Sequence, residues 1–345
     1  MNAMHVTNLT PIQNIQNIQN IPNAQPETAA MTAQTNTTKS TNRFDRLTRF
    51  TDRAAVVPAV TLGDPTPEAS VEVLRAVIRA GADALSVTLP FSDPCAHAPD
   101  CAHASVRALE AGADLEQSLR IVRTIRDEHP DLPVMLTLYA NQIAVLGLDA
   151  FTAAAAQAGV DALFIPDLPV AMRELEPRFD ECAQAEGLAL TGLLPPNADT
   201  ARIGKLTRIV TGAMVAPMPD AGLVEAVRTQ FRVMEAASSG DTPLPVLFDA
   251  DLSHIADPAN AAALGTALVR ILPELTGRKV PVAVAFGVGI AKILEAAPVE
   301  NRQVTAATLA RVETFVGDVA RMIRAVRTEA PDGREAARRP RAAAS

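Results

Sequence analysis

The pattern of residues 54–90 is AAVVPAVTLGDPTPEASVEVLRAVIRAGADALSVTLP, and it indicates the fold class. Two short apolar runs flank a segment in which apolar residues recur at helical spacing. A helix is expected to begin after Thr66, which can cap it, with Pro67 at its first position, and to end at Gly81. The two runs lack polar alternation, which is typical of strands buried on both faces of a parallel sheet. The stretch therefore predicts a strand–helix–strand unit.

The same pattern repeats along the chain. Eight apolar runs of strand length alternate with helical segments, which predicts a single (β/α)₈ TIM barrel over residues 43–329. An open, doubly wound α/β sheet remains the alternative, because periodicity alone does not count strands reliably. The predicted strands are 54–63, 83–90, 133–141, 161–169, 188–196, 212–219, 244–253 and 280–289.

The two ends of the chain differ from this body. Residues 1–42 are rich in Asn, Gln and Thr, and residues 330–345 form a basic stretch broken by proline, so both are predicted to be disordered tails. The net charge of -8 and the absence of a Lys/Arg run in the apolar body exclude a nucleic-acid or anionic-membrane surface. Three cysteines and no long apolar span indicate a cytoplasmic protein without disulfides.

Several short motifs follow the predicted strands, where a barrel carries its chemistry. The motifs are RFDRLTRF (43–50), TLGDP (61–65), PFSDP (90–94), YAN (139–141), PDLP (166–169) and LLPPNAD (193–199). Taken in order, they resemble the tryptophan synthase α subunit family from about Arg43 to Asp199. The resemblance implies a (β/α)₈ barrel that cleaves indole-3-glycerol phosphate by a retro-aldol step to indole and glyceraldehyde 3-phosphate, in tryptophan biosynthesis. It also implies a β-type partner subunit, which would hold the pyridoxal phosphate, so that this chain needs no cofactor.

The chain departs from the family at both catalytic carboxylates. The family has a Glu at the end of strand 2 and an Asp in the next loop, and here these positions hold Ser86 and His97. Loss of an acid or base typically costs about 10²- to 10⁴-fold in rate for each group. The carbon–carbon lyase reaction is therefore expected to be weak or absent, as in a degenerate paralogue or pseudoenzyme.

The resemblance also implies positions that would bind the substrate. Tyr139 matches a residue that lines the indole pocket. The phosphate loop has two candidate alignments: Gly287 and Gly289 would approach the phosphate if VAFGVG is the last strand, and Gly265 and Thr266 if it is not.

Two aspartates are candidates for contacts with a β-type subunit. Asp167 matches a family residue that takes part in communication between the subunits. Asp93, in the loop after strand 2, is the second candidate, and a loop brace is the plainer interpretation of its role.

The loop from Cys95 to His103 repeats the letters C-A-H. Cys95, His97, Cys101 and His103 supply the ligand types of a zinc site, but only one residue separates the members of each pair, where two to four are usual. Three hypotheses remain open: drift of an active-site loop in a non-catalytic partner or regulator of a β-type subunit, zinc binding, and altered acid–base or thiol chemistry that uses His97 with Cys95.

Overall fold

The structure, a computed structural model, describes residues 42–50, 53–95, 98–168, 178–195, 197–217, 233–234, 244–250 and 281–325. The predicted tails lie outside this part of the chain, except Asn42, whose side chain caps the first described helix. None of the described helices combines the length and the apolar composition needed to cross a membrane.

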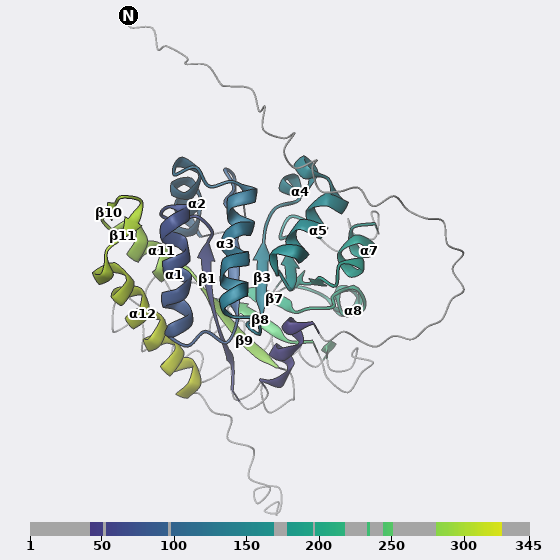
Figure 1. Ribbon diagram of the computed structural model, residues 1–345. Helices are drawn as coiled ribbons and strands as arrows, with labels where there is room; N and C mark the ends of the chain where they lie inside the picture. Colours follow the sequence, from purple (N-terminus) through teal and green to yellow (C-terminus); the bar gives the residue numbers. More distant parts are fainter. Residues whose placement is uncertain are drawn as a thin grey trace, which may run out of the picture. The chain divides into compact units, whose positions relative to one another are not determined.

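The described elements alternate between strands and helices, as predicted (Figure 1). The elements in chain order are the 3₁₀ helix η2 (Arg43–Arg49), β1 (Ala55–Thr61), α1 (Pro67–Arg79), β2 (Leu85–Thr88), α2 (Pro99–Glu110), α3 (Leu115–Glu128), β3 (Val134–Thr137), α4 (Ala140–Leu146), α5 (Leu148–Ala158), β4 (Ala162–Phe164), α7 (Arg178–Ala185), β5 (Ala189–Leu190), β6 (Gly192–Leu193), α8 (Thr200–Ile209), β7 (Met214–Pro217), β8 (Val246–Asp249), β9 (Val282–Phe286), α11 (Val288–Glu295), β10 (Val299–Glu300), β11 (Gln303–Val304) and α12 (Ala306–Ala325).

In the described part of the chain, nine parallel strands form a nearly closed barrel, in the order β5-β4-β3-β2-β1-β9-β8-β7-β6. Only Thr191 separates β5 from β6, and β5 pairs with β4 while β6 pairs with β7. The two short strands are thus one run that closes the sheet, so the barrel has eight positions, as predicted. The first and last strands, β1 and β9, are hydrogen-bonded neighbours.

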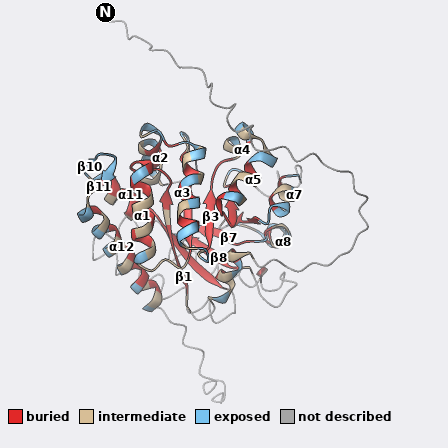
Figure 2. Ribbon diagram, viewed as in Figure 1, coloured by how far each residue is buried: buried red, intermediate tan, exposed pale blue. Residues whose placement is uncertain are grey.

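The barrel strands are buried on both sides, which explains their continuous apolar sequences (Figure 2). Along β9, Val282, Val284 and Phe286 belong to the layer under the helices, whereas Ala283 and Ala285 face the interior. The interior is rich in alanine, which occupies less space than the branched residues that usually fill such a barrel.

The amino-terminal end of the barrel is closed by η2. Phe44 and Leu47 of this helix belong to the interior cluster. Asn42 Nδ2 donates to the carbonyl oxygens of Asp161 and Gly187, 2.8 Å away in each case, just before β4 and β5. The open space inside the barrel therefore lies toward the other end.

A short motif occurs twice at the amino-terminal end, GADAL at 81–85 and GVDAL at 159–163. In each copy a glycine with positive φ ends a helix, and the aspartate accepts a hydrogen bond from a backbone N–H of a neighbouring strand. Asp83 accepts from Val56 N at 2.9 Å, and Asp161 accepts from Val134 N at 2.8 Å. Arg53 forms an ion pair with Asp83, and Arg126 forms one with Asp161. Both aspartates therefore connect adjacent strands.

Candidate functional site

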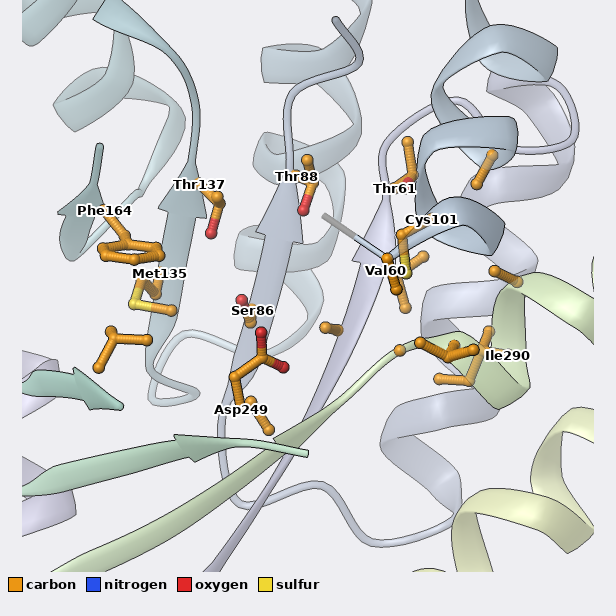
Figure 3. A pocket seen from close by; sticks show the side chains of 18 of the residues that line it. Val60, Thr61, Ser86, Thr88, Cys101, Met135, Thr137, Phe164, Asp249 and Ile290 are labelled. Carbon is orange, nitrogen blue, oxygen red and sulfur yellow. The ribbon is translucent and has the colours of Figure 1, made fainter. Parts of the chain in front are cut away.

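A cavity of about 280 Å³ opens among the carboxyl ends of the strands, where barrel enzymes place their active sites (Figure 3). Its apolar wall includes Met135, Phe164, Val215 and Leu247, all buried. The polar lining consists of hydroxyls and carboxylates from β1, β2, β3, β8 and the loop after β1. These residues are Thr61, Asp64, Ser86, Thr88, Thr137 and Asp249.

Ser86 lies in this cavity, in the middle of β2 and 5% exposed. Its register partners are Ala59 on β1 and Met135 on β3, and both also line the cavity. The structure therefore places Ser86 in the cavity, and its role in catalysis stays a prediction. Ser86 has a hydroxyl that does not titrate near neutral pH, so it cannot act alone as the acid or base.

His97 and the alternative phosphate residues Gly265 and Thr266 lie outside the described residues. The second C-A-H pair is helical, because α2 begins at Pro99. Cys101 lines the cavity. The side chain of His103 is 63% exposed, and its Nδ1 lies 3.7 Å from Oε1 of Glu295. Residues two apart on a helix do not face each other.

The zinc hypothesis gains no support from the residues that can be placed. Within the described ranges, no three or more His, Cys, Asp or Glu side chains gather as metal ligands. Cys95 is exposed in the loop after β2. A site that depends on His97 stays a prediction.

The last described strand of the barrel, β9, contains the VAF of VAFGVG and pairs with β1. The phosphate loop has two candidate alignments, and this strand meets the condition stated for the one that uses Gly287 and Gly289. Gly287 precedes α11 and lines the cavity. A Cβ on Gly289 would lie 2.2 Å from Cζ of Phe315 on α12, so Gly289 provides room for packing between the two helices. Phosphate binding by either glycine remains a prediction.

Tyr139 lies beside the cavity rather than along its wall. The strand ends at Thr137, which lines the cavity, and Tyr139 is the residue before α4. Its ring is buried and stacks on Phe91, with 5.0 Å between the centroids. Tyr139 therefore supports the loop after β2, and it is not among the described residues that line the cavity.

The two candidate inter-subunit aspartates are both exposed. Asp167 accepts hydrogen bonds from Ala140 N, at 3.0 and 3.2 Å, and so caps the amino terminus of α4. Asp93 lies in the loop after β2. Their placement on the rim is compatible with a partner contact, which stays a prediction.

Asp64, in the TLGDP motif, is the buried carboxylate of the site. Arg107 on α2 donates to both of its oxygens at 2.9 Å and also to the Ala291 carbonyl at 3.2 Å. Burial raises the pKa of Asp64 to about 6, although the Arg107 guanidinium acts to lower it. This pair joins the loop after β1 to α2 and α11, and it places a group that titrates near neutral pH at the cavity.

Asp249 was missed by the sequence analysis. It is the last residue of β8 and extends into the cavity (Figure 3). Two residues before it, Leu247 belongs to the interior cluster, and residues two apart on a strand share a face. That alternation within LFD was the signal that could have found it.

The chain was compared with known proteins. The family model described as tryptophan synthase alpha chain matches residues 46–278. The tryptophan synthase alpha chains of Shewanella oneidensis and Shewanella baltica are 44% and 45% identical over 156 and 148 residues. These matches cover 45% and 43% of this chain and 55% and 53% of the relatives. The chain thus matches about half the length of its curated relatives.

Solved structures share the fold. The tryptophan synthase subunit alpha from Legionella pneumophila has a TM-score of 0.65 at 24% identity, over 82% of this chain and 99% of that one. The tryptophan synthase complex from Pyrococcus furiosus has a TM-score of 0.60 at 23% identity, over 78% and 98%. Because the family model covers more than half of the residues, the chain belongs to the tryptophan synthase alpha chain family.

Proposed function

We propose that this protein is a tryptophan synthase alpha-like barrel in which the retro-aldol cleavage of indole-3-glycerol phosphate is weak or absent. The observation that carries the proposal is the buried hydroxyl of Ser86 on β2, inside the cavity, where the family pattern has a catalytic Glu. A serine at this position has no proton to exchange near neutral pH. The proposal assigns no cofactor to this chain.

The test is a steady-state assay of indole release from indole-3-glycerol phosphate. The wild-type chain is expected to turn over at least about 100-fold more slowly than the Shewanella oneidensis relative, since one acid–base group is worth about 10²- to 10⁴-fold. Ser86→Glu should raise the rate, and Ser86→Glu with His97→Asp should raise it further.

Ser86→Ala is the matched control, because it removes the hydroxyl without adding a carboxylate. Its rate should equal that of the wild type. Wild-type turnover as fast as that of the relative would overturn the proposal, and so would a large loss of rate in Ser86→Ala.

A β-type subunit is the proposed partner. Asp167 fixes the start of α4 at the rim of the barrel, and Val145 on that helix is 81% exposed. The partnership is proposed from the family resemblance, and the proposal assigns this exposed side of α4 to the contact. Pyridoxal phosphate would then belong to the partner.

Sedimentation of the chain with the β subunit of Shewanella oneidensis tests this partnership. A complex at micromolar concentration is expected, weakened by Val145→Asp and by Asp167→Ala but not by Asp131→Ala, which lies at the opposite end of the barrel. Failure to form a complex would contradict the proposal.

A further inference from the structure

The cavity has a row of hydroxyls along one side. Thr61, Thr88 and Thr137 are the last residues of β1, β2 and β3, and they are partners in the strand register. All three are more than nine-tenths buried and line the cavity, and Figure 3 shows their side chains on neighbouring strands. Each hydroxyl can donate one hydrogen bond and accept two. The row therefore offers hydrogen bonds to a molecule in the cavity.

The three hydroxyls differ from that of Thr191, which is also buried and lies between β5 and β6. The Thr191 hydroxyl donates to the Leu163 carbonyl at 2.9 Å. Within the described ranges, no protein group forms a hydrogen bond with the hydroxyls of Thr61, Thr88 or Thr137. Because a buried hydroxyl without a partner costs free energy, water or a ligand is needed to satisfy this row.

The two carboxylates of the described lining are already engaged. Asp64 accepts from Arg107 at 2.9 Å on both of its oxygens. Asp249 also interacts with another group. A ligand can thus bind to the hydroxyl row without displacing a contact within the protein.

The spacing of the row follows from the sheet. Adjacent strands lie about 4.8 Å apart, so neighbouring hydroxyls at one level of the register are separated by about that distance. The two oxygens of a benzene ring with hydroxyls in the meta positions have nearly the same separation. Ortho oxygens are much closer, about as near as a hydrogen-bonded pair at about 2.7 Å. A meta-dihydroxy ring therefore matches two adjacent threonines of the row.

The apolar side of the cavity begins on the next strand. Phe164 on β4 is the register partner of Thr137, and Met135 lies two residues before Thr137 on the same face of β3. Both line the cavity, as does Leu247 on β8. A ring whose hydroxyls reach Thr88 and Thr137 would therefore place its carbon atoms against Met135 and Phe164.

We propose that the cavity binds a neutral aromatic molecule with two hydroxyl groups in the meta arrangement. One hydroxyl of the ligand forms a hydrogen bond with Thr88 and the other with Thr137, while the ring and its alkyl substituent contact Met135, Phe164 and Leu247. A phenol is neutral near pH 7, so the site needs no cationic side chain. The inference rests on the proposed function only in placing a ligand in this cavity, and it names a different class of ligand.

Isothermal titration calorimetry of the full chain with three probes that share a pentyl chain tests the spacing. 5-Pentylresorcinol has meta hydroxyls, 4-pentylcatechol has ortho hydroxyls and 3-pentylphenol has one hydroxyl. Deoxygenated buffer prevents oxidation of the catechol. 5-Pentylresorcinol should bind about three- to tenfold more tightly than either of the others, since it makes one more hydrogen bond. This comparison uses the wild-type chain and does not depend on the folding of a variant.

Thr88→Val and Thr137→Val each keep the shape of the side chain and remove the hydroxyl. Each should reduce the preference for 5-pentylresorcinol over 3-pentylphenol to within about twofold. The unfolding temperature should stay the same or rise, because an unpaired hydroxyl is removed from the ligand-free chain. Thr191→Val is the matched control. It should lower the unfolding temperature, since it removes the hydrogen bond to Leu163, and leave the preference unchanged.

Equal binding of 5-pentylresorcinol and 4-pentylcatechol by the wild type would overturn the inference, as would failure of all three probes to bind. A preference that survives both Thr88→Val and Thr137→Val would do the same, because the ligand would then lie elsewhere. The assay of indole release is independent. Rapid lyase turnover would overturn the proposed function and leave the preference for meta hydroxyls in place, whereas loss of that preference would leave the weak lyase in place.

Discussion

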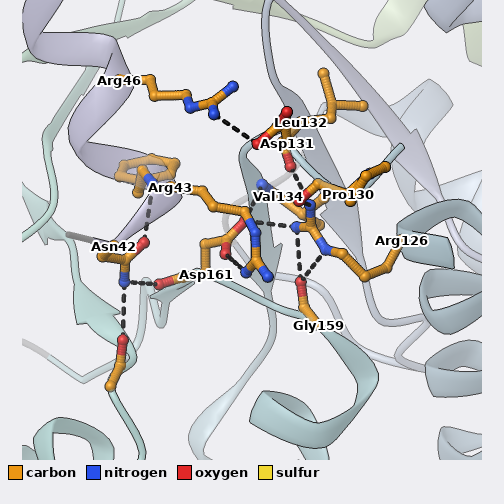
Figure 4. Close-up of polar contacts among 12 residues, drawn as sticks. Asn42, Arg43, Arg46, Arg126, Pro130, Asp131, Leu132, Val134, Gly159 and Asp161 are labelled. Carbon is orange, nitrogen blue, oxygen red and sulfur yellow. Dashed lines mark hydrogen bonds and ion pairs between the residues drawn. The ribbon is translucent and has the colours of Figure 1, made fainter. Parts of the chain in front are cut away.

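Asp161 and Asp249 stand at opposite ends of the barrel and have opposite surroundings. Asp161 precedes β4, and its carboxylate accepts from Arg126 at 2.6 Å, Arg43 at 2.7 Å and Val134 N at 2.8 Å (Figure 4). Asp249 ends β8 and lines the cavity. Asp161 at the amino-terminal end thus holds strands together, whereas Asp249 at the carboxyl end lines the cavity.

Removing the Asp161 carboxylate should destabilise the barrel more than any other change considered below. Asp161→Ala should lower the free energy of unfolding by roughly 3–5 kcal/mol, because it leaves a buried guanidinium without its carboxylate. The Arg126 side chain is only 7% exposed, and it also donates to the Gly159 carbonyl. Urea denaturation followed by circular dichroism measures the change.

Asp131→Ala is the matched control for that variant. Asp131 also pairs with an arginine, Arg46, at 2.6 Å, but its side chain is 77% exposed. An exposed pair contributes about 0–1 kcal/mol. Similar losses of unfolding free energy in Asp161→Ala and Asp131→Ala would contradict the prediction, because burial of the ion pair would then make no difference.

The two ends of the barrel should also differ in how their aspartates make stability depend on pH. Burial raises the pKa of Asp64 to about 6, whereas its unfolded value is 3.8, so between these values the folded chain binds a proton that the unfolded chain releases. The contribution of Asp64 to stability is therefore complete below pH 3.8 and is lost as the pH rises through 6. Two pKa units correspond to about 3 kcal/mol.

Asp83, at the amino-terminal end, should show the opposite sign. Burial acts to raise its pKa, but hydrogen bonds from Arg53 and Val56 N outweigh burial and lower it. Its contribution is present above pH 3.8 and is lost as the pH falls through the lowered value. Urea denaturation of Asp64→Asn and Asp83→Asn from pH 3 to pH 7 measures both, and equal signs for the two differences from the wild type would contradict the comparison.

The barrel could be predicted from the sequence, because strands that are buried on both faces have continuous apolar sequences. The family resemblance, rather than strand alternation, pointed to Ser86 and Tyr139. The structure places Ser86 among the residues that line the cavity. Tyr139 comes two residues after β3 ends at Thr137, and its role at an indole pocket stays a prediction. The role of the repeated Gly-x-Asp-Ala-Leu motif could not be predicted from the sequence. Its arginine partners, Arg126 and Arg53, lie elsewhere along the chain, and only the fold brings them to the aspartates.

The smallest effect concerns the start of α11, at the cavity end. Gly289→Ala should destabilise the fold by about 1–3 kcal/mol, the usual cost of overpacking, since its Cβ would meet the Phe315 ring. Gly317→Ala on α12 is the matched control. Its Cβ would lie 3.7 Å from the flexible Arg321 guanidinium, and alanine favours a helix by about 1 kcal/mol over glycine.

Thermal unfolding should therefore shift downward for Gly289→Ala and upward for Gly317→Ala. Thermal melts followed by circular dichroism measure both shifts. The two glycines differ in what an added Cβ meets, a packed aromatic ring at Gly289 and the end of a flexible side chain at Gly317. A Gly289→Ala variant as stable as the wild type would contradict the prediction, because the Phe315 ring would then have room to move away from α11.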